Sequence, residues 1–200
     1  MLGSFDEAWR IAREADTRLR ELTGRREGGA AHLAEIATLA GDHELEASYL
    51  RRQCKGLEEQ GHRNFLSTYA PRLGRALCAL GRHDEAEPLA RLGREIGDED
   101  DVATQAWWRQ AQALVGAARG EHAEAEALMH EAVAIVERTD ALNFQGYALT
   151  DLAEVLRAAG HLREAASALE QALERYERKQ NLAMVAQVRP KLAALRDETA

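Results

Sequence analysis

One phrase that begins with glycine occurs five times in the chain. The copies are GSFDEAWRIA, GDHELEASYL, GRHDEAEPLA, GEHAEAEALM and GHLREAASAL, and they begin at Gly3, Gly41, Gly81, Gly120 and Gly160. The intervals between these glycines are 38, 40, 39 and 40 residues. A fixed period of about 20 to 50 residues is typical of repeat proteins, in which one unit is too small to bury its own apolar face and stacks on its neighbours.

Each unit reads as a helix, a glycine turn and a second helix. The segments that end at the later four glycines, LAEIATLAG, LGRALCALG, AQALVGAARG and LAEVLRAAG, place apolar residues at or close to the i, i+3, i+4 and i+7 spacing of a helix. Glycine suits the residue after a helix, where the left-handed conformation is strained for residues that carry a Cβ. Aromatic residues are only 5% of the chain and prolines only three of 200 residues, a composition that favours helices over strands. We therefore expect an all-α protein, a right-handed α–α superhelix of antiparallel helical hairpins.

The period divides the chain into one domain of consecutive units. We expect a partial repeat at residues 1–26, full repeats at 27–62, 63–98, 99–140 and 141–180, and a capping helix at 181–200. Residues 1–3 read as the end of a first helix whose remainder is absent, which leaves the helix at residues 4–23 without its partner. We therefore expect the chain to be a fragment of a longer protein, with an N-terminal helix that offers a surface for homo-oligomerisation.

Asparagine and proline suggest where individual helices begin and bend. Asn64 and Asn143 are good N-cap residues, so we expect one helix to begin at each of them. Pro71 and Pro190 lie inside segments that otherwise read as helices, and a proline there removes one backbone hydrogen bond. We expect a kink or a late helix start near residue 71, and a kinked or split final helix.

Small residues recur at fixed distances after the turn glycine. Alanine follows by five residues in four units (Ala8, Ala86, Ala125 and Ala165), a larger apolar residue by nine (Leu50, Met129 and Leu169), and alanine by twelve (Ala15, Ala132 and Ala172). This pattern resembles the tetratricopeptide repeat (TPR), although the units are longer than the roughly 34 residues usual in that family. The second unit departs from it, with Glu46 at the fifth position and Ala47 beside it, and we expect shifted or looser packing there.

A narrower resemblance lies in residues 100–140 and 148–181. These segments are similar to the C-terminal TPR regions of actinobacterial signalling proteins that join a class III adenylate or guanylate cyclase to an ATPase module, and to related ATPase-type transcription activators. Such a resemblance implies a regulatory region, because the chain contains no Gly-x-x-x-x-Gly-Lys-Ser/Thr stretch that could bind phosphate. Any catalysis in such a parent protein would lie outside these residues.

The remaining sequence features indicate neither a catalytic, metal or cofactor site nor direct binding to nucleic acid. His43, His83 and His122 each follow a turn glycine by two residues, a position that Phe5 and Leu162 occupy in other units, so we interpret it as a packing position. We expect no catalytic residues, no metal and no cofactor. The net charge of −8 is distributed over both signs, which argues against direct nucleic-acid binding. Without a signal peptide or a run of eighteen apolar residues, we expect a cytoplasmic protein that does not enter a membrane.

The concave face of such a superhelix, lined by the first helices, is the expected binding surface. The repeat phase places on it Glu35, Thr38, Arg75, Trp107, Gln110, Tyr147, Thr150, Glu154 and Arg157. A groove of mixed charge with Trp107 and Tyr147 as aromatic anchors suits an extended peptide or a helix from a protein partner or from another domain of the same chain. The alternative for Trp107 is that it fills space left by small residues such as Gly116. The expected function is a non-enzymatic protein-interaction module; the alternative is a sensor of a small molecule or peptide in a transcription regulator or nucleotide cyclase.

Overall fold

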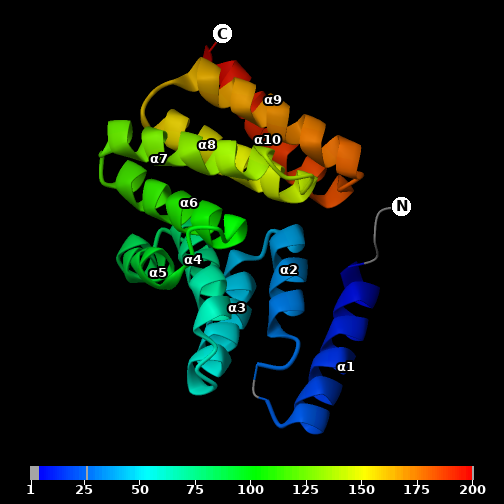
Figure 1. The fold of residues 1–200 in the computed structure, drawn as a ribbon. Coiled ribbons are helices and arrows are strands. Elements are labelled where there is room, and N and C mark those ends of the chain that lie inside the picture. Colours follow the sequence, from blue (N-terminus) through cyan, green and yellow to red (C-terminus); the bar gives the residue numbers. More distant parts are fainter. Residues whose placement is uncertain (1–4, 26, 200) are drawn as a thin grey trace.

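The computed structural model describes residues 5–25 and 27–199, which form ten α-helices and no strand (Figure 1). The helices are α1 (Phe5–Thr23), α2 (Ala30–Ala40), α3 (His43–Glu59), α4 (Arg63–Ala79), α5 (His83–Ile96), α6 (Val102–Ala118), α7 (His122–Glu137), α8 (Leu142–Ala158), α9 (Leu162–Lys179) and α10 (Leu182–Thr199). Helices α2 and α3, α4 and α5, α6 and α7, and α8 and α9 pair as consecutive antiparallel hairpins. The chain is thus the all-α, right-handed superhelix of hairpins that the sequence predicts.

The turn glycines end the first helix of each hairpin as expected. Gly41, Gly81, Gly120 and Gly160 have φ angles of 72°, 72°, 83° and 84°, in the left-handed region that disfavours a side chain. The residue after Gly41 bonds back into the helix, because the amide of Asp42 donates to the Ala37 carbonyl at 3.0 Å. The side chain of Asp42 then caps α3 by accepting from the Leu45 amide at 2.9 Å. Gly3 lies outside the described residues.

Two of the expected helix starts are wrong. Helix α4 begins at Arg63 and α8 at Leu142, so Asn64 and Asn143 lie in the first turns of these helices rather than at their caps. Asn143 instead pairs across helices, with its Oδ1 accepting from Asn181 Nδ2 at 3.0 Å. Asn181 is the asparagine that caps a helix, since its Oδ1 accepts from the Met184 amide at 3.2 Å at the start of α10.

The prolines neither delay nor split their helices. Helix α4 is continuous through Pro71 and α10 through Pro190, which corrects the expected late start and split. Packing accommodates Pro71, because Gly93 of α5 leaves room for its ring: a Cβ at Gly93 would lie 2.8 Å from Pro71 Cγ. The buried contact with α5 offsets the one hydrogen bond that the proline removes.

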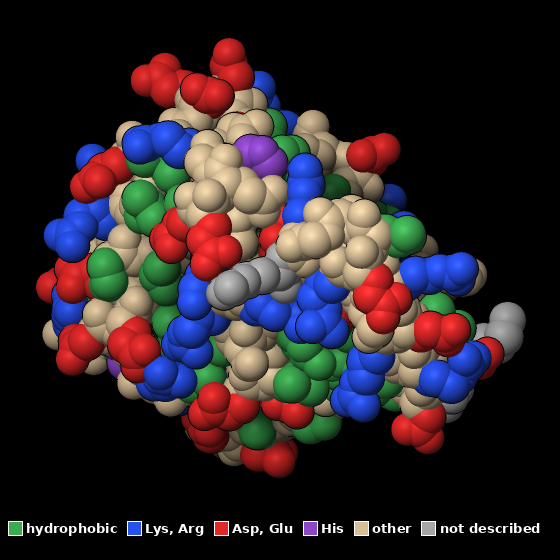
Figure 2. Space-filling model, turned by 90° about the horizontal axis from the view of Figure 1, so that it is seen from below, with side chains coloured by type: hydrophobic (Ala, Val, Ile, Leu, Met, Phe, Trp, Pro, Cys, Tyr) green, Lys and Arg blue, Asp and Glu red, His purple; other side chains and the backbone are tan. Residues whose placement is uncertain are grey.

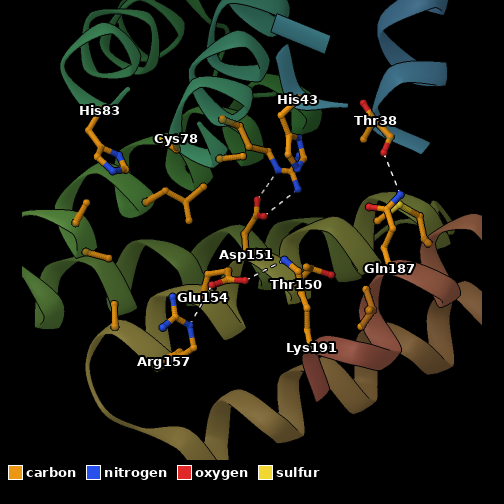
Figure 3. Close-up of a pocket in the computed structure, with 18 residues that line it drawn as sticks. Thr38, His43, Cys78, His83, Thr150, Asp151, Glu154, Arg157, Gln187 and Lys191 are labelled. Carbon is orange, nitrogen blue, oxygen red and sulfur yellow. Dashed lines mark hydrogen bonds and ion pairs between the residues drawn. The ribbon is translucent and has the colours of Figure 1, made fainter. Parts of the chain in front are cut away.

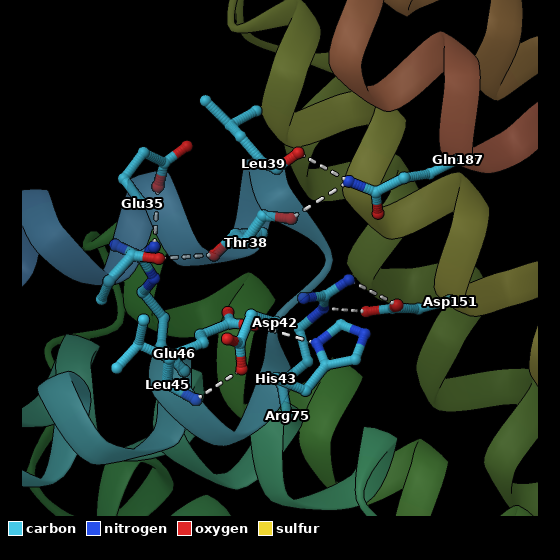
Figure 4. A network of polar contacts seen from close by, with 12 residues as sticks. Glu35, Thr38, Leu39, Asp42, His43, Leu45, Glu46, Arg75, Asp151 and Gln187 are labelled. Atoms are coloured by element: carbon cyan, nitrogen blue, oxygen red, sulfur yellow. Dashed lines mark hydrogen bonds and ion pairs between the residues drawn. The ribbon is translucent and has the colours of Figure 1, made fainter. Parts of the chain in front are cut away.

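The superhelix is wound tightly enough for its end to reach its beginning. Two apolar clusters form the core, one centred on α6 to α10 and one on α3 to α5. Helix α10 packs on α9 and also contacts α2, where Gln187 Nε2 donates to the carbonyls of Leu39 at 2.8 Å and Thr38 at 3.3 Å. Figure 4 shows these two bonds between α10 and the end of α2. This closure decides how much of the concave face stays open.

Candidate functional site

A cluster of polar side chains crosses the inside of the superhelix and joins hairpins that are not neighbours. We call Glu35, Arg72, Arg75, Tyr147 and Asp151 the central cluster. Arg75 of α4 donates to Asp151 of α8 through Nε to Oδ2 at 2.6 Å and Nη2 to Oδ1 at 2.9 Å. Glu35 of α2 accepts from Arg72 Nη2 and from Tyr147 Oη, each at 2.9 Å. The cluster therefore ties α2 and α4 to α8 across the concave face (Figure 4 shows the Arg75–Asp151 pair).

Aromatic packing reinforces the central cluster. The Trp107 ring stacks on Phe144 with centroids 4.5 Å apart and lies tilted against Tyr147 at 6.3 Å. The guanidinium groups of Arg72 and Arg75 lie 5.4 and 5.9 Å from the centre of the Trp107 ring, within the range of a cation–π interaction. Trp107 and Tyr147 are only 7% and 4% exposed. In this conformation both aromatic side chains hold helices together and offer little surface to a partner.

Glu46, the residue that breaks the alanine pattern, is buried beside this cluster. Its Oε2 lies 3.1 Å from His43 Nδ1, and Arg75 contributes a favourable charge interaction. Burial alone raises the pKa of Glu46, but the hydrogen bond to His43 and the charge of Arg75 outweigh it, so that the pKa is lowered below the ordinary glutamate value. Of the expected shifted or looser packing, the looser alternative is wrong, because Glu46 and Ala47 are 2% and 1% exposed. The hairpin of α2 and α3 uses this position for a polar contact instead of a small side chain.

A cavity of about 430 Å³ opens beside the central cluster, toward the turn ends of the first helices (Figure 3). Its walls come from α2, α4, α6, α8 and α10 and from the starts of α3 and α5. One part of its lining is polar and another is apolar. The lining residues are Thr38, His43, Arg75, Cys78, Ala79, His83, Leu114, Ala117, Ala118, Thr150, Asp151, Glu154, Arg157, Ala158, Met184, Gln187, Val188 and Lys191.

The charges of this cavity are partly paired. Glu154 lies between Lys191, at 3.0 Å, and Arg157, at 3.3 Å, as Figure 3 shows. Burial tends to raise the pKa of Glu154, but these two cations lower it below the ordinary value. Three cations (Arg75, Arg157 and Lys191) against two carboxylates (Asp151 and Glu154) give the lining a net charge of +1, in a chain of net charge −8. The net charge of the lining thus has the opposite sign to the net charge of the whole chain.

The central cluster separates the predicted groove residues into two groups. Arg75, Thr150, Glu154 and Arg157 line the cavity, together with Thr38. Glu35, Trp107 and Tyr147 line a second hollow, of about 300 Å³, toward the start of the first helices. Gln110 lines neither hollow and is 0% exposed, with its Nε2 bonded to the Ala106 carbonyl at 3.2 Å. The central cluster therefore lies between these two hollows and interrupts the expected continuous trough.

Sequence reasoning did not identify several residues of the cavity. Asp151 follows Thr150 directly and is a carboxylate in an apolar helical segment, a signal that could have found it. Gln187 and Lys191 reach the cavity because α10 closes against α2, and nothing in their local sequence indicates that closure. His43 and His83 occupy the turn position that the sequence predicts to be a packing position. They line the cavity as the first residues of α3 and α5.

The two cysteines are poor nucleophiles, and the described residues hold no candidate metal site. Cys54 and Cys78 are both free and buried, and burial raises the pKa of each thiol to about 12. A thiol with such a pKa is protonated at neutral pH, whereas the thiolate is the nucleophile. Among residues 5–25 and 27–199, no three His, Cys, Asp or Glu side chains are grouped so that they could hold a metal ion.

Charged side chains of both signs cover the face in Figure 2, with several basic ones near its centre. A shallow hollow between α1 and α3 is lined by Arg20, Arg25, Arg52 and Lys55. Asp16 neutralises part of this charge, because its carboxylate lies 2.6 Å from Arg52 and 3.3 Å from Arg20. The same carboxylate accepts from the Gly29 amide at 2.8 Å, so these contacts attach α1 to its neighbours.

Within the described part of the chain, no helix combines the length and the hydropathy needed to span a bilayer.

Comparison with known proteins supports a TPR-like array. Residues 103–178 match the family model described as Tetratricopeptide repeat. Among solved structures, the chain is similar to a variant form of the nearly identical TPR-like repeats of a putative kinesin light chain from Podosopora anserina, with 21% identity, 89% of each chain covered and a TM-score of 0.52. A second structure of these repeats has 20% identity, covers 88% of this chain and 87% of its own, and has a TM-score of 0.48. No curated protein matches the sequence.

Proposed function

We propose that the chain is a non-enzymatic protein-interaction module whose cavity receives a short segment of a partner protein. The observation that carries this proposal is the cavity of about 430 Å³ with charged groups on one wall and Leu114, Met184 and Val188 on others. Concave sites with apolar walls and a few convergent polar groups are the usual form of a ligand site. TPR-like arrays are generally scaffolds without catalysis.

The size of the site limits the length of the bound segment. An extended peptide along the whole concave face would have to cross the central cluster, where the Arg75–Asp151 and Glu35–Tyr147 contacts span the interior. A cavity of this volume suits a few residues of a loop or a chain end. The groove residues that remain available for such contacts are Glu154 and Arg157, with Lys191 beside them. Thr150 also lines the cavity, but it is 6% exposed and its hydroxyl donates to the Gly146 carbonyl.

The experiment is a selection of peptides from a display library with the whole chain as bait, repeated with one blocked variant and one control. Ala118→Trp places a large ring on an exposed residue of the cavity lining, and Ala127→Trp places the same ring on an exposed residue of α7 outside it. We expect the selected peptides to lose binding to Ala118→Trp and to keep it with Ala127→Trp. Peptides that bind both variants equally, or the absence of any selected peptide, would refute the proposal.

A sensor of a small molecule is the second candidate, favoured by the contact between the first full hairpin and the last helix at the cavity. Gln187 of α10 bonds the last turn of α2, and both Gln187 and Thr38 line the cavity. A ligand there would contact both α2 and α10 and could change the winding of the superhelix. In a thermal-unfolding screen of metabolites, a ligand at about one hundred times its Kd should add about 2.7 kcal/mol of stability. That gain should be absent in Ala118→Trp.

The biological setting that we propose is a regulatory region of a cytoplasmic bacterial signalling protein. Its support is the resemblance of residues 100–140 and 148–181 to the TPR regions of cyclase–ATPase proteins. In that setting the partner is another domain of the same polypeptide or a separate signalling protein. The test is the sequence of the complete gene, in which a cyclase or ATPase domain next to this array is expected and its absence would contradict the setting.

A further inference from the structure

Helix α1 has the position of a second helix in a hairpin, but its partner face is exposed. In α5, α7 and α9 the alanine five residues after the turn glycine is at most 1% exposed, because the first helix of the same hairpin covers it. Its equivalent in α1, Ala8, is partly exposed, and Ala15, equivalent to the fully buried Ala132 and Ala172, is exposed. Ile11, Leu19 and Leu22 of α1 are 52%, 41% and 78% exposed. Helix α1 therefore presents the surface on which other hairpins carry their first helix.

Helix α10 has the position of a first helix in a hairpin, and the face that would contact the second helix is exposed. It follows α8 by 40 residues and packs on α9 through Met184, Val188 and Leu192, as first helices pack on the preceding hairpin. Ala186 and Ala193 of α10 are exposed, whereas their equivalents in α8, Gly146 and Ala153, are buried, and Gly146 lies directly against Tyr176 of α9. Figure 1 shows α1 at one end of the array and α10 packed with α9 at the other.

We propose that α10 of one copy of this chain packs antiparallel against α1 of a second copy. The two helices together then form one further hairpin, with α10 as its first helix and α1 as its second. Each surface is of the kind that the other covers in the internal hairpins. The contact joins different surfaces of the two copies, so it is heterologous and extends into a chain or closes into a ring. Neither hollow of the inner face takes part in this contact, which is independent of the proposed function.

The repeat register fixes which residues meet. In the second hairpin, Gly74 of α4 lies against Ala86 and Leu89 of α5; the equivalent residues are Ala193 of α10 and Ala8 and Ile11 of α1. In the last hairpin, Gly146 of α8 lies against Tyr176 of α9; the equivalent pair is Ala186 of α10 and Leu19 of α1. Small residues on α10 thus face apolar residues on α1. Leu19 is smaller than Tyr176, which leaves room for the Cβ of Ala186 that the internal hairpin lacks at Gly146.

A charge pair follows the same register. Arg109 of α6 and Glu131 of α7 form an ion pair of 2.8 Å, with positions eleven residues before and eleven residues after Gly120. The equivalent residues are Arg189 in α10 and Glu14 in α1, which have the same charges. Both side chains are now in exposed pairs, Arg189 with Glu177 at 2.9 Å and Glu14 with Arg10 at 3.5 Å. Such surface pairs are weak enough to exchange for a contact between copies.

The experiment measures the mass of the whole chain in solution by sedimentation equilibrium over a range of concentrations. We expect association that increases with concentration. Leu19→Glu blocks α1 and Ala186→Glu blocks α10, so each variant alone should be monomeric. A mixture of the two should form a one-to-one dimer, because Leu19→Glu keeps its α10 surface and Ala186→Glu keeps its α1 surface. Both sites are exposed, and circular dichroism checks that each variant is folded.

Charge reversal gives a second and independent measurement. Glu14→Arg or Arg189→Glu should each weaken association at least about tenfold, since like charges then meet, and the double variant should recover most of the loss. Glu124→Arg, on an exposed position of α7, is the control and should have no effect. A wild-type chain that is monomeric at every concentration overturns the proposal. So does association that Ala186→Glu leaves intact, which would indicate pairing of α1 with α1.

Discussion

Arg75 and Asp151 form a two-bond ion pair between α4 and α8, helices of hairpins that are not adjacent in the array. The two bonds are 2.6 and 2.9 Å long, and the side chains are only 12% and 7% exposed. Desolvation raises the pKa of Asp151 above the ordinary aspartate value, and the guanidinium of Arg75 opposes that shift. Consecutive hairpins stack in any such array, but this pair draws together the second and fourth hairpins and so limits the opening of the superhelix.

Removal of one member of this pair should be strongly destabilising. Asp151→Ala leaves the Arg75 guanidinium buried without its hydrogen-bonded counter-charge, and we expect it to lower the free energy of unfolding by about 3 to 5 kcal/mol in urea denaturation. Glu14→Ala removes a carboxylate that is 72% exposed in an ion pair, and it should change stability by less than about 0.5 kcal/mol at low protein concentration. Equal effects of the two variants would show that the central cluster does not hold the hairpins together.

Acid should destabilise the fold in part through Glu46. Its pKa is lowered in the folded state, so the unfolded state binds the proton more tightly and ionised Glu46 stabilises the fold at neutral pH. That contribution is complete above the ordinary pKa of 4.5 and is lost as the pH falls through the lowered folded value. Glu46→Gln should therefore flatten the decline in unfolding free energy below about pH 5. Glu44→Gln, at a side chain that is 73% exposed, is the control and should leave the pH profile unchanged.

Trp107→Ala should act mainly on stability. The indole stacks on Phe144 and is 7% exposed, so its loss leaves a large cavity between α6 and α8 and should cost about 3 to 5 kcal/mol. Phe65→Ala, at a phenyl ring that is 55% exposed, should cost far less. Thermal unfolding measures both. A Trp107→Ala protein that is as stable as Phe65→Ala would show that the indole is available to a partner instead.

Most of the fold can be predicted from the repeat period, because the glycine turns and the alanine contacts depend on residues close by in the sequence. The left-handed conformation at Gly81 depends only on its own helix end, and the burial of Ala86 depends only on its own hairpin. Features of this kind can be predicted from one repeat. The same reasoning identifies which face of a first helix points inward, and so it finds Arg75, Thr150 and Glu154 at the cavity.

The winding of the superhelix could not be predicted in this way. Its tightness depends on the sum of small rotations between hairpins, and only that sum brings Gln187 to α2 and Asp151 to Arg75. A groove that is predicted from the residue positions within single repeats is therefore open along its whole length, whereas the central cluster crosses the interior of the structure. Gln110 illustrates the same limit, because its phase points inward but neighbouring helices bury it completely.

The close approach of α8 and α9 depends on the absence of a side chain at Gly146. A Cβ there would overlap the ring of Tyr176, which is 0% exposed and whose Oη lies 3.5 Å from Thr150 Oγ1. Gly146→Ala must displace this ring or separate the helices, and we expect it to lower the free energy of unfolding by about 1 to 3 kcal/mol, although alanine favours the helix. Tyr176→Leu removes the atoms that clash, so the alanine should be better tolerated in the double variant than in wild type. A double-mutant cycle from urea denaturation measures the difference, and strictly additive losses would show that the two residues do not oppose each other.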